Sequence, residues 1–174
     1  MKRSILLLLA VGSLAFTACN NDDDDNATQN DDNAVGVYRL ASFNAPSAQD
    51  LDGDGATSGD LASEFDCYAN WEIVLHQDHT FMRTYNVTDA VDGQLTCQTG
   101  QTSTGTWIRS GQTLTLTNAL GEDETATTYT FSADNAILTQ TGQGQFPTIF
   151  EDIFVMEPGT VTVVYAKQDD TMQR

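Results

Sequence analysis

Three alternating aspartates are the residues of this sequence best suited to bind a metal ion. Asp50, Asp52 and Asp54 precede Gly55 in the segment DLDGDG. Calcium in proteins takes six to eight oxygen ligands at about 2.3–2.6 Å, and alternating carboxylates on a tight loop that contains glycine can converge on one ion. The pattern therefore predicts a calcium-binding loop.

The remaining ligands of this loop are less regular. Ala56 occupies the seventh position, from which loops of the EF-hand type donate a backbone carbonyl oxygen. The twelfth position is Leu61 where an acid is expected, so Asp60 and Glu64 are the candidates for the closing ligand. No flanking helices are predicted, and the alternative to calcium is an Asp/Gly-rich turn that caps a short helix over 59–65.

Residues for other chemistry are sparse. His76 and His79 have no companion zinc ligands and are expected to form a polar hairpin tip. The sequence has no G-x-S-x-G nucleophile elbow and no glycine-rich phosphate loop, so we expect a protein that is not an enzyme.

With 25 acidic and 7 basic residues, the chain has a formal net charge of −18 and would repel nucleic acid.

Residues 1–18 have the features of an export signal. Lys2 and Arg3 form a positive start, and the apolar run over 5–16 is shorter than the about 20 residues that span a bilayer as a helix. The run ends in FTAC, which resembles the lipobox of bacterial lipoproteins. That resemblance implies cleavage before Cys19 and acylation of its sulfur, which would anchor the protein to a lipid bilayer. The alternative is an ordinary cleaved signal that leaves a free thiol.

Residues 19–33 are predicted to be a disordered tether. The stretch NNDDDDNATQNDDN is acidic and has no apolar anchors, so it cannot bury enough surface to fold. An acidic run after the lipidated cysteine also resembles the surface-export signal of Bacteroidota lipoproteins. We therefore expect a lipid-anchored outer-membrane protein on the cell surface, with the periplasmic face as the alternative.

The two other cysteines, Cys67 and Cys97, are predicted to form a disulfide. In an exported protein an isolated pair of cysteines is most simply a disulfide. The sequence between them contains an apparent hairpin that turns near 77–79, and the cysteines stand before and after its two strands. Closing this loop is expected to stabilise the fold by roughly 3–4 kcal/mol.

Alternating apolar and polar residues predict one all-β domain over 34–174. The turn near 157–159 is expected to precede the last strand, and 148–156 fits helix and strand equally. About eight strands joined by tight turns predict an antiparallel barrel, with a β-sandwich as the alternative. Single strands are expected over 36–43, 71–76, 80–87 and 160–168, and hairpins over 104–118 and 125–141.

The order of several short motifs resembles the lipocalin-like lipoproteins of Bacteroidota. These motifs are the opening strand GVYRLAS, the DLDGDG loop, the GTW…GQTLTLT hairpin and the terminal VYAKQ. The resemblance covers most of the chain after Val35 and implies a small barrel, without by itself implying a ligand.

Aromatic residues on the predicted strands are candidates to line the interior of such a barrel. An eight-stranded barrel is either filled by its own side chains or holds one small ligand. An open interior would make this a binding module for a small apolar ligand. A filled one would favour a structural or accessory lipoprotein that docks on an outer-membrane protein partner. The candidate ligand-binding residues are Trp71, Phe81, Tyr85, Trp107, Tyr129 and Phe131.

Overall fold

The computed structural model describes residues 31–119 and 125–169, and within these ranges the chain is almost entirely β-structure. The predicted signal peptide and Cys19 lie outside the described residues, and the predicted tether is described only over 31–33. No helix in the described part is long and apolar enough to cross a membrane. The elements are η1 (Asp31–Asn33), β1 (Gly36–Gln49), β2 (Ser58–Asp60), η2 (Asp66–Tyr68), β3 (Glu72–Leu75), β4 (Thr80–Val91), β5 (Gln94–Ser110), β6 (Thr113–Asn118), β7 (Ala126–Phe131), β8 (Ile137–Phe150) and β9 (Ile153–Lys167).

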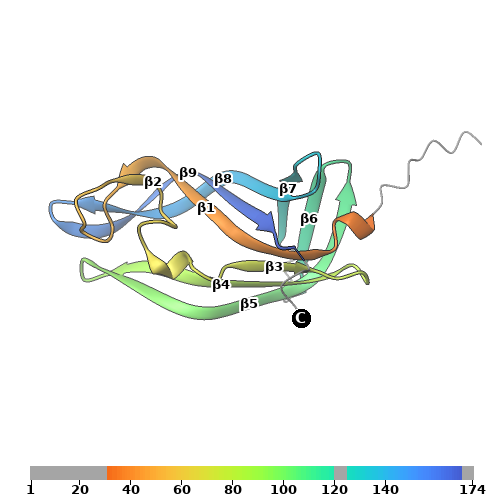
Figure 1. Ribbon diagram of the computed structural model, residues 1–174. Coiled ribbons are helices and arrows are strands. Elements are labelled where there is room, and N and C mark those ends of the chain that lie inside the picture. The colour runs from red at the N-terminus through yellow and green to blue at the C-terminus, as the bar shows by residue number, and fades with distance from the viewer. Residues whose placement is uncertain (1–30, 120–124, 170–174) are drawn as a thin grey trace, which may run out of the picture.

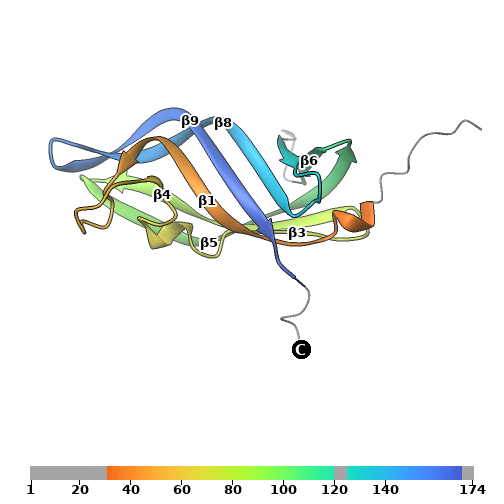
Figure 2. The same cartoon turned by 45° about the horizontal axis from the view of Figure 1, so that its top comes forward.

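The described strands form one antiparallel sheet that closes into a barrel (Figures 1 and 2). From β3 to β9 each strand pairs with the next, β3 pairs with β1, and β1 also pairs with β9, which closes a ring of eight strands. The short β2 adds to the end of β1 outside this ring. The predicted all-β, eight-stranded antiparallel barrel is confirmed, and the sandwich alternative is wrong because one continuous sheet closes on itself.

Large side chains fill the barrel where β6 and β7 lie. Trp107 faces Leu116 across the β5–β6 pair, and Leu114 faces Tyr129 across β6–β7. All four are at most 2 % exposed. Strand residues two apart point to the same face, so the alternation that predicted these strands also directs these side chains inward. This end of the barrel is a packed core.

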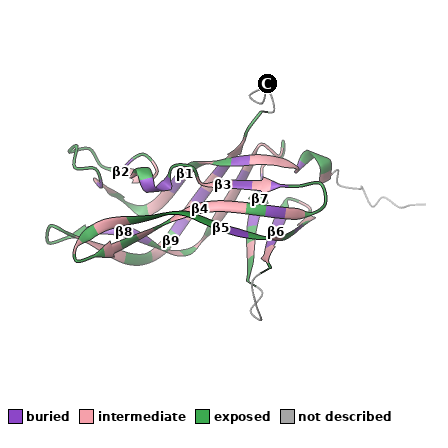
Figure 3. Ribbon diagram, turned by 90° about the horizontal axis from the view of Figure 1, so that it is seen from below, coloured by how far each residue is buried: buried purple, intermediate pink, exposed green. Residues whose placement is uncertain are grey.

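Two long hairpins, β4–β5 and β8–β9, extend beyond the shorter strands toward the left of Figure 1. Their turns are exposed, as Figure 3 shows, and the tips meet where the backbone N–H of Phe154 donates to the Gly93 carbonyl at 3.1 Å. The segment 148–156, whose sequence fits helix and strand equally, therefore consists of the end of β8, a two-residue turn and the start of β9. The turn residues Glu151 and Asp152 have φ of 50° and 64°, as tight hairpins with right-handed twist require.

The turn predicted at 157–159 is wrong, because β9 runs straight through it. The pairing of β9 with β1 extends only to Thr162, so at Pro158 the strand has β8 on one side only. Proline lacks a backbone N–H, and it is tolerated there because no second strand needs a hydrogen bond from that side of β9. Gly159 serves close packing, since a Cβ at this position would lie 2.8 Å from the Phe146 ring.

Candidate functional site

A lid segment, residues 65–71, links β2 to β3 at the mouth between the two long hairpins. It contains η2, which packs on β4 and β5. The Cys67–Cys97 disulfide ties the lid segment to β5, with a Cα–Cα distance of 5.6 Å, so the predicted disulfide is confirmed. The Asn86 side-chain amide also fastens the lid segment to β4, since it donates to the carbonyls of Cys67 and Ala69 at 2.8 and 3.2 Å.

Four aromatic side chains from β1, the lid segment and β4 form a contiguous group, called here the aromatic cluster: Phe43, Tyr68, Trp71 and Tyr85. Phe43 stacks on Tyr68 with ring centroids 4.7 Å apart. Trp71 meets Tyr68 edge-on at 5.5 Å and Tyr85 edge-on at 6.4 Å. Edge-to-face and offset-stacked contacts are the favourable arrangements for aromatic pairs, so the cluster is a rigid apolar wall.

This wall lines a cavity of about 220 Å³ between the two long hairpins. The cavity reaches from β4 across to β8 and β9, and most of its surface is apolar. It is smaller than the roughly 300–1,000 Å³ of sites for drug-sized molecules, so it suits a short ligand. Its lining consists of the aromatic cluster with Asn86, Val87, Thr88, Gln145 and Met156.

The predicted ligand-binding aromatics divide between this cavity and the core. Trp71 and Tyr85 line the cavity. The other four candidates, Phe81, Trp107, Tyr129 and Phe131, are 1–2 % exposed and fill the barrel. The cavity residues Phe43 and Tyr68 were not among the predicted ones. Tyr68 lies in a short 3-10 helix with no strand periodicity, and its only sequence signal is its place beside Cys67.

Two members of the cluster, Tyr68 and Trp71, have buried polar atoms. Burial raises the pKa of Tyr68 to about 12, and the Thr88 hydroxyl lies close enough to oppose part of this rise without forming a well-aligned hydrogen bond. The buried Trp71 Nε1–H also has no acceptor among the described residues. An unsatisfied buried donor costs roughly 1–3 kcal/mol, so a ligand oxygen would be favourable there.

An arginine contacts one ring of the cavity wall. Arg83 lies two residues after the inward-facing Phe81 on β4, and its guanidinium carbon lies 4.9 Å from the centre of the Tyr85 ring. Its Nε donates to Ser103 Oγ at 3.3 Å, and its Nη1 donates to the Tyr129 hydroxyl at 3.5 Å. Burial raises the pKa of Tyr129 and the Arg83 charge opposes the rise, so this phenol stays protonated at neutral pH.

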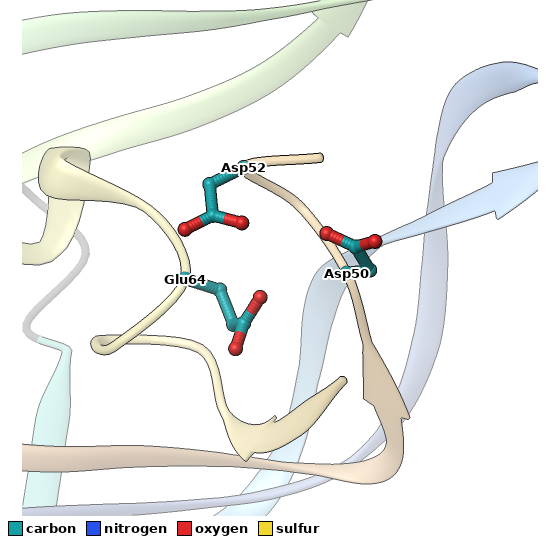
Figure 4. A group of neighbouring side chains, drawn as sticks. All are labelled: Asp50, Asp52 and Glu64. Carbon is teal, nitrogen blue, oxygen red and sulfur yellow. The ribbon is translucent and has the colours of Figure 1, made fainter. Parts of the chain in front are cut away.

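The Asp-rich loop brings three of the predicted metal ligands together (Figure 4). One carboxylate oxygen each of Asp50, Asp52 and Glu64 lies within 4.8 Å of the other two. Glu64 is only 8 % exposed, and its carboxylate accepts the backbone N–H of Leu51 at 3.3 Å. Oxygen atoms at this separation can share one cation of the size of calcium.

The other predicted ligands lie outside this group. The Asp54 carboxylate accepts the backbone N–H of Ala56 at 2.7 Å and is exposed. Asp60 turns toward β1, where its Oδ1 accepts the backbone N–H groups of Phe43 at 2.8 Å and Ala62 at 3.1 Å. Of the two closing candidates, Glu64 is the one that the fold brings to Asp50 and Asp52.

A second, larger hollow of about 390 Å³ lies on the other side of the lid segment. It shares Tyr68 and Trp71 with the cavity, but polar groups, among them Asp60, Ser63 and Asn70, make up much of its lining. We place the candidate ligand site in the smaller cavity, because an apolar wall with few polar groups is the usual character of a small-molecule site.

A closed barrel with an aromatic cavity at one end defines the lipocalin type of architecture. The family described as the lipocalin-like domain matches residues 35–139, more than half of the chain, and the chain belongs to this family. No curated protein matches the sequence, and no solved structure matches it.

Proposed function

We propose that this protein is a binding module that takes a small, largely apolar ligand in the aromatic cavity. The observation that carries the proposal is the contrast between the two ends of the barrel. The core where β6 and β7 lie is filled by buried side chains, whereas the aromatic cluster lines an open hollow of about 220 Å³ beside the lid segment, which the disulfide fastens to β5. Binding of a ligand, and not catalysis, is the role proposed for this site.

The test is calorimetric titration of the purified full chain with 1-octanol, a short apolar probe. We expect saturable binding at one site, and loss of binding in a Met156→Trp variant, whose indole would fill the cavity. The matched control is Ile108→Trp, because Ile108 is 64 % exposed on the outside of the barrel. Unsaturable uptake, or equal binding by both variants, would contradict the proposal.

We further propose that Cys19 carries a lipid anchor that holds the module on the outer membrane, facing the cell surface. The FTAC motif and the acidic run after it support this placement. A Cys19→Ala variant should move from the membrane fraction to the soluble fraction of the cell. Protease added to intact cells should digest the wild-type protein; full protection would place it on the periplasmic face instead.

Calcium is proposed as the ligand of the Asp-rich loop, supported by the convergence of Asp50, Asp52 and Glu64. A bound ion should raise the thermal midpoint of the full chain relative to chelator, since a ligand at a hundred times its Kd stabilises by about 2.7 kcal/mol. Glu64→Gln should abolish the shift and Asp54→Asn should keep it. A midpoint that calcium leaves unchanged would reduce the loop to a turn.

Docking on an outer-membrane protein is the second candidate function, and an exposed apolar patch favours it. The tip patch consists of Phe150 and Ile153, which face each other across the β8–β9 turn and are 58 and 48 % exposed. Contiguous apolar surface of this kind often marks an interaction site. A Phe150→Ser/Ile153→Ser variant should then lose co-purification with a membrane partner while it still binds 1-octanol.

A further inference from the structure

The two long hairpins end in tight turns that are joined to each other. In both hairpins the strands pair as far as the residues that flank a two-residue turn. The Phe154 N–H, which donates to the Gly93 carbonyl, connects one turn to the other. Ile153 packs against the same glycine, since a Cβ added to Gly93 would lie 3.1 Å from the Ile153 side chain. The tip patch is therefore held on a fixed support, and docking on it would cost little ordering of loops.

The charged side chains around the tip patch are all carboxylates. The hairpin tips are defined here as residues 87–98 and 148–158, which contain both turns and the strand ends beside them. The described basic residues all lie outside these two ranges. The one ion pair in the described part of the chain joins Arg39 to Glu72, so the acidic residues of the tips are uncompensated. These residues are all exposed: Asp89, Asp92, Glu151, Asp152 and Glu157.

This charge distinguishes among the partners that could cover the tip patch. Exposed like charges repel one another within a Debye length of about 8 Å at physiological salt. A second copy that docked tip to tip would bring two acidic surfaces together, and an anionic lipid surface would repel the tips in the same way. A protein surface with basic side chains around an apolar depression complements both the charge and the exposed apolar residues.

We propose that the hairpin tips dock on a partner protein whose surface presents Lys or Arg side chains around an apolar depression. Phe150 and Ile153 enter the depression, and the carboxylates of Glu151 and Asp152, which lie between them in the sequence, pair with its basic rim. This inference rests on the docking function proposed above and specifies the chemistry of the partner. Buried apolar anchors supply most of the affinity of such an interface, and the rim charges set its orientation and association rate.

Two synthetic peptides take the place of the partner in the test. One is an amphipathic helix of leucine and lysine, and the other has glutamate in place of every lysine, so the two share an apolar face and differ in the sign of the charge. The readout is the backbone N–H resonance of Gly93 in the isotope-labelled full chain. This resonance reports binding at the joined turns and not at acidic residues elsewhere.

The leucine–lysine peptide should shift the Gly93 resonance saturably, and the leucine–glutamate peptide should leave it in place. Raising the salt from about 50 to about 500 mM should weaken binding about tenfold, because exposed charges are screened. Phe150→Ser/Ile153→Ser should also weaken it about tenfold or more, as expected for the loss of two apolar anchors. Ile108→Ser is the matched control, since Ile108 is 64 % exposed outside the tips, and it should bind like the wild type.

A second pair of variants tests the charges. Glu151→Gln/Asp152→Asn should weaken binding of the leucine–lysine peptide several-fold and should reduce its salt dependence. Asp31→Asn/Asp32→Asn removes the same number of charges from η1, which lies at the opposite end of the barrel in Figure 1. This control should leave the affinity at the tips within about twofold.

The outcomes separate this inference from the docking function. Equal shifts by both peptides, or an unchanged affinity in Glu151→Gln/Asp152→Asn, overturn the basic partner and leave the apolar patch as a docking surface. A Gly93 resonance that moves with phosphatidylglycerol vesicles and with neither peptide overturns the inference in favour of a lipid surface. Co-purification with a membrane partner that survives Phe150→Ser/Ile153→Ser overturns docking through the tips altogether.

Discussion

Removal of the disulfide should weaken this barrel substantially. Cys67 and Cys97 are 30 residues apart in sequence, and the loop that they close contains β3, β4 and the start of β5. In the chain-entropy treatment, closing a loop of this length lowers the entropy of the unfolded chain and stabilises the fold by about 3.6 kcal/mol. In a Cys67→Ala/Cys97→Ala variant the free energy of unfolding should fall by this amount. Truncation of the buried Cys67 side chain should lower it slightly further.

The assay is equilibrium unfolding in denaturant, supported by a thermal melt in which the midpoint should fall by roughly 10–15 °C. Reductant should lower the stability of the wild type toward that of the double variant and should leave the double variant unchanged. Hydrogen exchange should show the largest loss of protection in the lid segment, because the disulfide holds it to β5. A change below about 1 kcal/mol would refute the loop-closure reasoning.

Three further perturbations test the packing and the electrostatics. Gly105→Ala should destabilise the barrel by several kcal/mol in a denaturant titration, since the added Cβ would collide with the Thr117 carbonyl. The control Gly142→Ala should leave the stability unchanged, because a Cβ at that position meets no atom within 4 Å. The pKa of Tyr68 is raised from 10.0 to about 12 in the folded protein, so its contribution to stability should be complete below pH 10 and lost as the pH rises through 12. Unfolding midpoints across this range, with tyrosinate absorbance, check the sign; a flat profile contradicts it. Asp60→Ala should cost about 1–2 kcal/mol in thermal melts, because its carboxylate accepts two backbone N–H groups that join β1 to the loop after β2; an unchanged midpoint would show that water replaces it.

The barrel was predictable because strand alternation is a local signal. Residues that fill the core, such as Trp107 and Leu114, occur at every second position of short segments bounded by turns. Errors arose where a local signal was outweighed or overlooked. The dipeptide Pro158-Gly159 is typical of a turn but lies within β9. Proline is tolerated there because β9 pairs with β8 alone at this point, and glycine allows the Phe146 ring to pack closely against the backbone. The dipeptide Asp92-Gly93 is a strong hairpin signal that was overlooked. It forms the turn between β4 and β5, and both strands therefore extend further toward this turn than predicted.

The candidate site was only partly predictable. Alternating carboxylates identified Asp50 and Asp52, but the choice of Glu64 over Asp60 required the path of the chain after β2. Trp71 and Tyr85 were among six equivalent aromatics until packing separated them from the four that fill the core. Nothing local in the sequence indicates that Tyr68 is buried against Phe43.

The sequence by itself determined most of the strands, the barrel and the disulfide, because periodicity and turn residues are local signals and the segment 34–174 contains only two cysteines. Only the tertiary structure decided which inward-facing side chains fill space and which surround a cavity. That distinction depends on register and closure: the β1–β9 pairing closes the ring, and the unequal strand lengths leave two hairpins to enclose the mouth. The same packing leaves Arg83 beside Tyr85 without a carboxylate, a relation between chain segments that spacing in the sequence does not encode.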